Sequence, residues 1–373
     1  MGVITRHQQR AIDFVEQQAK LGSERANDCI DAILARANVT RESYDKATAI
    51  LSSQAQIAVH FHPERISRFG KVVAEGLLQS GRFKNQFETG LSSGSTSAFP
   101  GGARDLWERH LFGGAYHADD VHPSVRPKYG ALHLLDHPDG PAPRFGSCYF
   151  LLHPTVSARS TFTFGGSQEP DALLHTGSIN TLAPIFARIF NELELGQGAF
   201  GISELNVASL LDDLICRFST PANILQNAKK YSIEKLILGR ALDSFVEVQI
   251  HGEIRLDKDV SQLVADPAFQ DQHTGEVLGK ISTRYGIPLS WHPGFMLKVE
   301  QVPYEFRGYP IAPLARRAAK NGLLDAADIG ALANSLELEP DAWKDWASYD
   351  DTLIQFRRLW HFMVMEGAPR GMF

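Results

Sequence analysis

The sequence predicts an α+β protein with a mainly antiparallel sheet and surrounding helices. Helical periodicity is strong at both ends of the chain, and short strand-like runs in a Gly- and Pro-rich setting lie between them. No internal repeat or low-complexity tract points to a solenoid or a disordered chain. The length of 373 residues suggests one large domain with helical additions. We expect a helical region at 1–54, a main domain at 55–320 and C-terminal helices at 321–373.

Composition restricts the class of partner and the compartment. The net charge is −6, from 37 basic and 43 acidic residues, and no basic run occurs, so nucleic acid is not the expected partner. The three cysteines, Cys29, Cys148 and Cys216, are far apart and are expected to be reduced structural thiols. No apolar run has the length of a signal peptide or a membrane span. We therefore expect no membrane partner, and a cytoplasmic location or export by a specialised system without a cleavable signal.

Helices are expected first. Within residues 1–54, Ala11, Phe14 and Val15 share one side of a first helix, and an apolar stripe continues through the second. Thr40 is placed to cap a third helix. A strand at 57–62 then ends at Pro63, and a helix is expected from about residue 66 to 79.

Residues 80–170 have the composition of short strands joined by long loops. The expected strands are Asn85–Leu91, Lys128–Leu135, Ser147–Leu152 and Ser160–Phe164. A helical insertion follows at about 170–240, with helices at about 181–192, 203–217 and 223–240. A further strand, Ser244–Arg255, closes the domain, and two helices at about 324–336 and 349–365 end the chain.

The strand at 245–251 carries the most informative pattern. Because strand side chains alternate, Val246, Val248 and Ile250 share one face, and an aromatic ring, an acid, an amide and an imidazole share the other. The members of this second face are Phe245, Glu247, Gln249 and His251. A solvated sheet face is the plain alternative, but we expect this face to line a reactive site with Glu247 as its key carboxylate.

A second polar pattern ends the strand at 57–62. His60 and His62 alternate with apolar residues, and Arg65 follows just past Pro63. Such a strand end suits metal binding or the gripping of an anionic ligand. The alternative is that the histidines only bond to backbone groups.

Other candidates are weaker. The loop Ser92–Ser97 is rich in hydroxyl groups, but neither GxxxxGK[ST] nor GxGxxG occurs to make it a phosphate cradle. His117, Asp119, Asp120 and His122 have metal-ligand residue types, although a solvated turn is the better interpretation. No GxSxG motif and no cysteine in a nucleophile setting are present.

Several short motifs together resemble a bacterial and fungal family described only as a domain of unknown function. These motifs are HFHPER (60–65), FETG and FPGG (87–90 and 99–102), LFGGAY (111–116), RPKYGAL (126–132), RFGSCYF (144–150), RSTFTFG (159–165) and VEVQIHG (246–252). The likeness covers about residues 50–320. That family is in turn similar to the ADP-ribosyltransferase superfamily, which implies a split antiparallel sheet and cleavage of NAD as substrate, with no metal.

The superfamily resemblance assigns roles to particular residues. Glu247, followed by an aliphatic residue at a strand start, matches the catalytic glutamate. His62 or Arg65 matches the group that holds the dinucleotide. The nicotinamide end is supported by a hydroxyl group, for which Ser95–Ser97, Tyr116, Tyr129, Thr161 and Thr163 all compete. Gln249 and His251 complete the expected NAD-binding set.

The implied activity is mono-ADP-ribosyl transfer to an acceptor, expected to be a protein, as in an effector or toxin. Arginine-modifying relatives carry a second acid two residues before the glutamate, where this chain has Phe245, so the acceptor stays open. A metal-dependent hydrolase using His60, His62, Glu247 and His251 is the main rival. A catalytically inactive NAD-binding module is the third reading.

Overall fold

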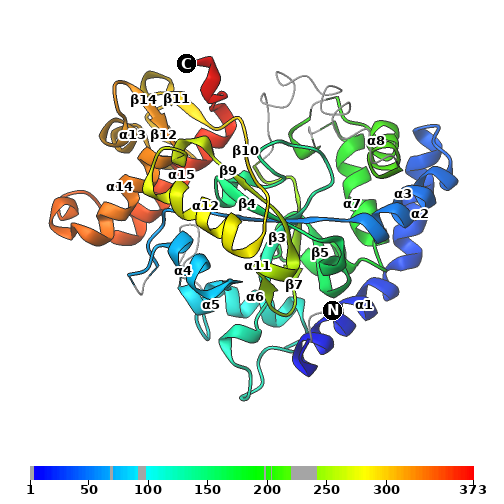
Figure 1. Cartoon of the computed structure of the whole chain (residues 1–373). Coiled ribbons are helices and arrows are strands. Elements are labelled where there is room, and N and C mark those ends of the chain that lie inside the picture. Colours follow the sequence, from blue (N-terminus) through cyan, green and yellow to red (C-terminus); the bar gives the residue numbers. More distant parts are fainter. Residues whose placement is uncertain (1–3, 68–69, 91–97, 197–198, 203, 220–241) are drawn as a thin grey trace. The chain divides into compact units, whose positions relative to one another are not determined.

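The computed structural model describes residues 4–67, 70–90, 98–196, 199–202, 204–219 and 242–373 (Figure 1). The chain divides into two compact units, each built from three separate segments. The first unit contains residues 1–59, 100–137 and 152–253, and the second contains 60–99, 138–151 and 254–373. No helix in the described part of the chain is long and apolar enough to cross a membrane.

Helices cover the sheet of the first unit. The helices predicted for residues 1–54 are present as α1 (Arg6–Leu21), α2 (Ser23–Arg36) and α3 (Arg41–Gln54). Thr5 opens α1 with a capping box, and Thr40 caps α3 as expected. In the same unit, α2 packs on α7 (Ala183–Glu194) and α3 packs on α8 (Val207–Ser219) (Figure 1).

The strands of the first unit run in the order β1-β3-β7-β5-β6, and every neighbouring pair is antiparallel. Their bounds are β1 (Ile57–Phe61), β3 (Lys128–Leu132), β7 (Val246–Ile250), β5 (Ser160–Phe164) and β6 (Thr176–Ser178). Gly130 lets β3 approach β1 closely, since a Cβ at this position would lie 2.7 Å from the carbonyl oxygen of Ala58. β1 and β7, the two strands with the polar patterns, are therefore separated by β3.

The second unit combines three strands with a helical C-terminal part. β10 (Leu289–Trp291), β9 (Val260–Ala265) and β4 (Cys148–Leu152) follow one another in the sheet, with β10 and β9 parallel. The helices are α4 (Val73–Ser80), α12 (His273–Tyr285), α13 (Ala312–Ala318), α14 (Ala326–Leu338) and α15 (Tyr349–Glu366). Two-stranded pairs are β2–β8 (Arg82–Phe83, Ile254–Arg255), β11–β14 (Met296–Lys298, Leu323–Asp325) and β12–β13 (Glu305–Phe306, Tyr309–Pro310).

The α+β class and the mainly antiparallel pairing agree with the prediction, but several elements differ. The strand expected at 85–91 is wrong, because Asn85 and Glu88 form a capping box that opens a helical turn, α5 (Gln86–Thr89). Helix α6 (Ala103–Leu111) and helix α12 were not predicted. The helix expected from residue 66 begins only at Val73, and the helix expected at 223–240 lies outside the described residues.

The two units also divide the chain differently from the three regions expected from the sequence. Residues 55–320 contribute to both units, and residues 1–54 belong to the first unit together with the strands that follow.

Candidate active site in the first unit

The polar row on β7 lies on one face of the sheet, as strand alternation predicts. Val246, Val248 and Ile250 form the opposite, buried face. The polar face is buried as well, because Gln249 and His251 are completely inaccessible. Glu247 keeps 7% of its surface exposed, more than any other residue of the row.

Neighbouring strands add further predicted residues to this face. Tyr129 of β3 and Thr161 of β5 lie opposite Gln249, and Thr163 of β5 lies opposite Glu247. The structure thus brings together six candidate residues, five on three adjacent strands and His251 directly after β7: Tyr129, Thr161, Thr163, Glu247, Gln249 and His251.

A continuous chain of hydrogen bonds runs along this face toward Glu247. The Tyr116 hydroxyl lies 2.5 Å from Nδ1 of His251, and Nε2 of His251 lies 3.2 Å from the Thr161 hydroxyl. Thr161 donates to Oε1 of Gln249 over 2.8 Å, and Nε2 of Gln249 donates to Oε1 of Glu247 over 3.0 Å.

The chain has only one consistent direction. Because the Thr161 hydroxyl proton is used toward Gln249, its oxygen must accept from Nε2–H of His251. Nδ1 of His251 then accepts from Tyr116. Burial lowers the pKa of His251 to about 3, which keeps the imidazole neutral in this single tautomer. Each of the four linked hydrogen bonds is therefore donated in the direction of the Glu247 carboxylate, and Nε2 of Gln249 also donates to the Thr163 hydroxyl over 3.2 Å.

Burial and hydrogen bonding act on Glu247 in opposite directions. Burial raises its pKa, whereas hydrogen bonds from Ser167 and Gln249 and the positive charge of Arg104 lower it. The backbone N–H of Ser167 donates to the same Oε1 atom over 3.4 Å. The net pKa is raised, so Glu247 gains charge at a higher pH than an exposed glutamate.

A second buried carboxylate lies on helix α6. Glu108 is fully buried, accepts from the Tyr129 hydroxyl over 2.8 Å, and pairs with Nη1 of Arg126 over 2.9 Å. Arg126 also pairs with Asp105, one turn earlier on the helix. Burial raises the pKa of Glu108 although Arg104 and Arg126 oppose the shift. This network fixes the Tyr129 ring on the sheet face.

Arg104 adds a positive charge next to the polar face of the sheet. Its guanidinium carbon lies 4.7 Å from the centre of the Trp107 ring and 4.6 Å from that of Tyr129. It is the cation whose charge acts on both Glu108 and Glu247. Its buried Nε atom has no hydrogen-bond partner among the described residues. Arg104 therefore offers a positively charged, aromatic-flanked surface beside two carboxylates.

Sequence reasoning did not find Arg104, Glu108 or Arg126. The signal was the i, i+3, i+4 spacing of Arg104, Trp107 and Glu108, which places the three side chains on one side of a helix. The helix itself was missed, because the Pro100-Gly101-Gly102 run before it suggested a loop.

His62 and Arg65 belong to the second unit. Nδ1 of His62 lies 3.6 Å from the Glu64 carboxylate, and Nε of Arg65 lies 3.7 Å from it. Burial raises the pKa of Glu64 to about 7 and lowers the pKa of both His62 and Arg65. Ser95–Ser97 lie outside the described residues.

The histidines that a metal-dependent hydrolase would use as ligands already form hydrogen bonds through their ring nitrogens. Nδ1 of His60 lies 3.0 Å from the carbonyl of Gly146, and its Nε2 accepts from the backbone N–H of Ala142 over 3.3 Å. Both nitrogens of His251 are likewise bonded. Among the residues that the structure describes, no group of three or more His, Cys, Asp or Glu could hold a metal ion.

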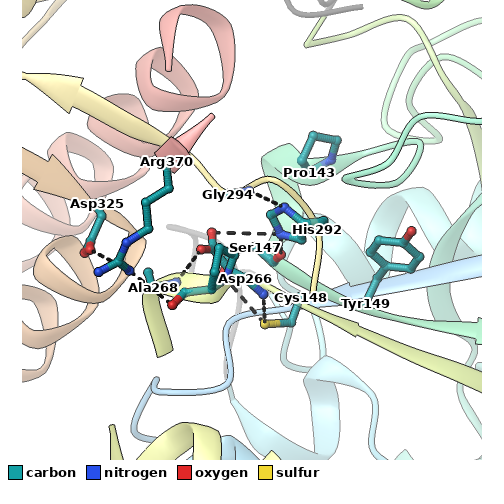
Figure 2. A network of polar contacts seen from close by, with 12 residues as sticks. Pro143, Ser147, Cys148, Tyr149, Asp266, Ala268, His292, Gly294, Asp325 and Arg370 are labelled. Carbon is teal, nitrogen blue, oxygen red and sulfur yellow. Dashed lines mark hydrogen bonds and ion pairs between the residues drawn. The ribbon is translucent and has the colours of Figure 1, made fainter. Parts of the chain in front are cut away.

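Another buried polar network in the second unit surrounds Asp266 (Figure 2). Its Oδ1 caps the backbone N–H of Ala268 over 2.9 Å, and its own N–H donates to the Cys148 sulfur over 3.4 Å. His292 donates from Nε2 to the Ser147 carbonyl over 2.8 Å (Figure 2). Burial raises the pKa of Asp266 to about 8. Cys148 is fully buried and its thiol pKa is raised well above the usual value, so this network is structural.

The comparisons with known proteins define the family. A family model described as "Protein of unknown function (DUF3626)" matches residues 56–365, far more than half of the chain. The chain belongs to this family. A search of curated proteins gave no match.

Proposed function

We propose that the chain is an NAD-dependent mono-ADP-ribosyltransferase in which Glu247 carries the catalytic step and the acceptor is a protein. The observation that supports this most is the Glu247 carboxylate at the end of a buried, one-directional hydrogen-bond chain, on the residue of the row that keeps the largest exposed fraction. A split antiparallel sheet of the ADP-ribosyltransferase type is part of the same proposal.

The role of Glu247 follows from the charge that develops in the reaction. Breaking the bond between nicotinamide and ribose builds positive charge on the ribose, as in glycoside cleavage. A carboxylate bonded to the ribose 2′-hydroxyl helps the transition state more than the ground state, because its attraction grows with that charge. Gln249 and the groups behind it hold the carboxylate in place, so little reorganisation is needed.

Arg104 and its aromatic neighbours suit the rest of the dinucleotide. A guanidinium group balances the negative charge of a pyrophosphate, and an aromatic ring stacks on a flat nicotinamide or adenine ring. Tyr129 is positioned by Glu108, so its ring is preorganised for such stacking. The assignment of His62 or Arg65 as the group that holds the dinucleotide stays a prediction.

Replacement of Glu247 by Gln tests the proposal directly. The variant keeps the size and hydrogen-bonding capacity of the side chain but removes its charge. We expect normal folding, retained NAD binding and a fall in nicotinamide release of about 100- to 1,000-fold. Release is measured with labelled NAD, alone and with cell lysate as a source of acceptor. Glu253→Gln, at an exposed acid just beyond β7, is the matched control and should retain full activity.

Two results would contradict the proposal. Near-normal turnover by Glu247→Gln would place the catalytic carboxylate elsewhere. NAD binding by the wild type without any nicotinamide release or labelled acceptor would identify a catalytically inactive NAD-binding module.

A further inference from the structure

Four arginines gather around a buried histidine in the second unit, and we call them the arginine cluster. Arg357 and Arg358 lie on α15, Arg144 lies in a single helical turn at Pro143–Phe145, and Arg307 occupies the turn between β12 and β13. His361 lies one turn after Arg357 on the same helix and is 1% exposed.

Packing contacts bring these elements together. The indole N–H of Trp360 donates to the Pro143 carbonyl over 2.9 Å, which fixes the turn that carries Arg144 against α15. The rings of Phe306 and Phe362 lie 5.6 Å apart, which fixes the β12–β13 turn against the same helix. The guanidinium carbon of Arg358 lies 5.9 Å from the ring centre of Tyr309 in β13.

The electrostatic surroundings of His361 are strongly positive. Its burial and the charges of all four members of the arginine cluster lower its pKa to about 2. Arg357 responds in the same way, since burial and the charges of Arg358 and Arg144 lower its pKa. The Nδ1 atom of His361 is buried without a hydrogen-bond partner among the described residues. The fold thus holds like charges and an unpartnered polar atom close together, an arrangement that a bound anion would stabilise.

We infer that the arginine cluster and His361 form a binding site for the phosphate groups of a small anionic ligand. Guanidinium groups bind phosphate oxygens through paired hydrogen bonds, and several guanidiniums favour a multiply charged oxyanion over a single carboxylate. Arg144, Arg357 and Arg358 are only half-buried, so a small ligand can reach them. This inference is independent of the proposed transferase activity, because none of its residues belongs to the Glu247 face.

Titration calorimetry of the full chain with inorganic pyrophosphate, at constant ionic strength, tests the inference. We expect binding by the wild type and by Glu247→Gln alike. Arg357→Ala should weaken the affinity about 10- to 100-fold, the range for one charged hydrogen-bonding group. Arg316→Ala removes an exposed arginine of α13 in the same unit and should leave the affinity unchanged.

Circular dichroism establishes that each variant is folded. If Arg357→Ala does not fold, Arg357→Gln takes its place, with the same loss expected because the stem is kept and the charge removed. The absence of binding heat for the wild type at millimolar pyrophosphate would overturn the inference. Equal affinities of the Arg357 and Arg316 variants would overturn it too, because the attraction would then be a general effect of surface charge.

Discussion

At the scale of single residues, the hydroxyl group of Thr161 joins His251 to Gln249 in the hydrogen-bond chain that ends at Glu247. It donates one hydrogen bond to Gln249 and accepts one from His251, so it links the two halves of the chain that ends at Glu247. A side chain of the same shape without the hydroxyl would leave both partners buried and unsatisfied. The hydrogen bond from Gln249 would then hold the Glu247 carboxylate less firmly.

We therefore expect Thr161→Val to shift the pH profile of nicotinamide release. The proposed role of Glu247 requires its ionised form, so under this proposal turnover should rise with pH through the raised pKa of this carboxyl group. The variant should move this rise upward by about one pKa unit, equivalent to ~1.4 kcal/mol. Thr283→Val, at an exposed threonine of α12, should leave the profile in place. A Thr161→Val profile that overlays the wild-type curve would show that the chain does not tune Glu247.

Strand alternation explains which site residues were predictable. The period of two placed Glu247, Gln249 and His251 on one face without knowledge of the fold. The same rule placed Thr161 and Thr163 together on β5. Their meeting with β7 depended on strand order, which no local pattern contains. Arg104, Glu108 and Arg126 reach the face through the packing of α6 and β3, so the sequence alone did not predict them.

At the scale of elements, two glycines differ in whether the structure leaves room for a side chain. Gly130 lies where β1 and β3 approach closely, and an added methyl group would meet backbone that cannot move away cheaply. Gly279 lies within α12, where an added methyl group would have no atom within 4 Å. The same substitution should thus have opposite effects at the two positions.

We expect Gly130→Ala to lower the free energy of unfolding by about 1 to 3 kcal/mol, as overpacking commonly does. Gly279→Ala should raise it by up to about 1 kcal/mol, because alanine favours a helix more than glycine does. Chemical denaturation measures both. A neutral Gly130→Ala would mean that β1 and β3 separate easily, and their pairing would then contribute little to stability.

The errors in predicting elements have local causes. Residues 85–91 were assigned to a strand from their composition, although the Asn-x-x-Glu spacing at Asn85 and Glu88 is typical of a helix start. Helix α6 was obscured by the preceding glycines, which suggested a loop. Strands β3, β4 and β5 were predicted correctly because buried strands are short apolar or alternating runs.

At the scale of the whole molecule, two buried carboxyl groups link stability to pH. Burial raises the pKa of Asp266 to about 8 and that of Glu64 to about 7 in the folded chain. In the unfolded chain both groups ionise near pH 4. The unfolded state therefore releases protons first, and the stability present at low pH is progressively lost as the pH rises from about 4 to 8.

The Asp266→Asn substitution should remove much of the pH dependence of the unfolding free energy. Asparagine keeps the cap on Ala268 but cannot ionise. We expect the variant to exceed the wild type in unfolding free energy at pH 8 by more than ~1.4 kcal/mol, the equivalent of one pKa unit, and to approach it near pH 5. Denaturation curves across this range measure the difference. The exposed Asp271→Asn variant serves as control, and equal slopes for all three proteins would contradict the expectation.

The interleaving of the two units has a consequence for synthesis on the ribosome. The chain passes from one unit to the other after Val59, Phe99, His137, Leu151 and Glu253. Residues 60–99 therefore emerge long before the rest of the second unit, and the first unit lacks β7 until residue 250 has been made. Neither unit can therefore fold completely before segments of the other unit have been synthesised. β7, which carries Glu247, is the last strand of the first unit to be made and lies between β3 and β5, so it completes this unit and its buried polar face in the same event.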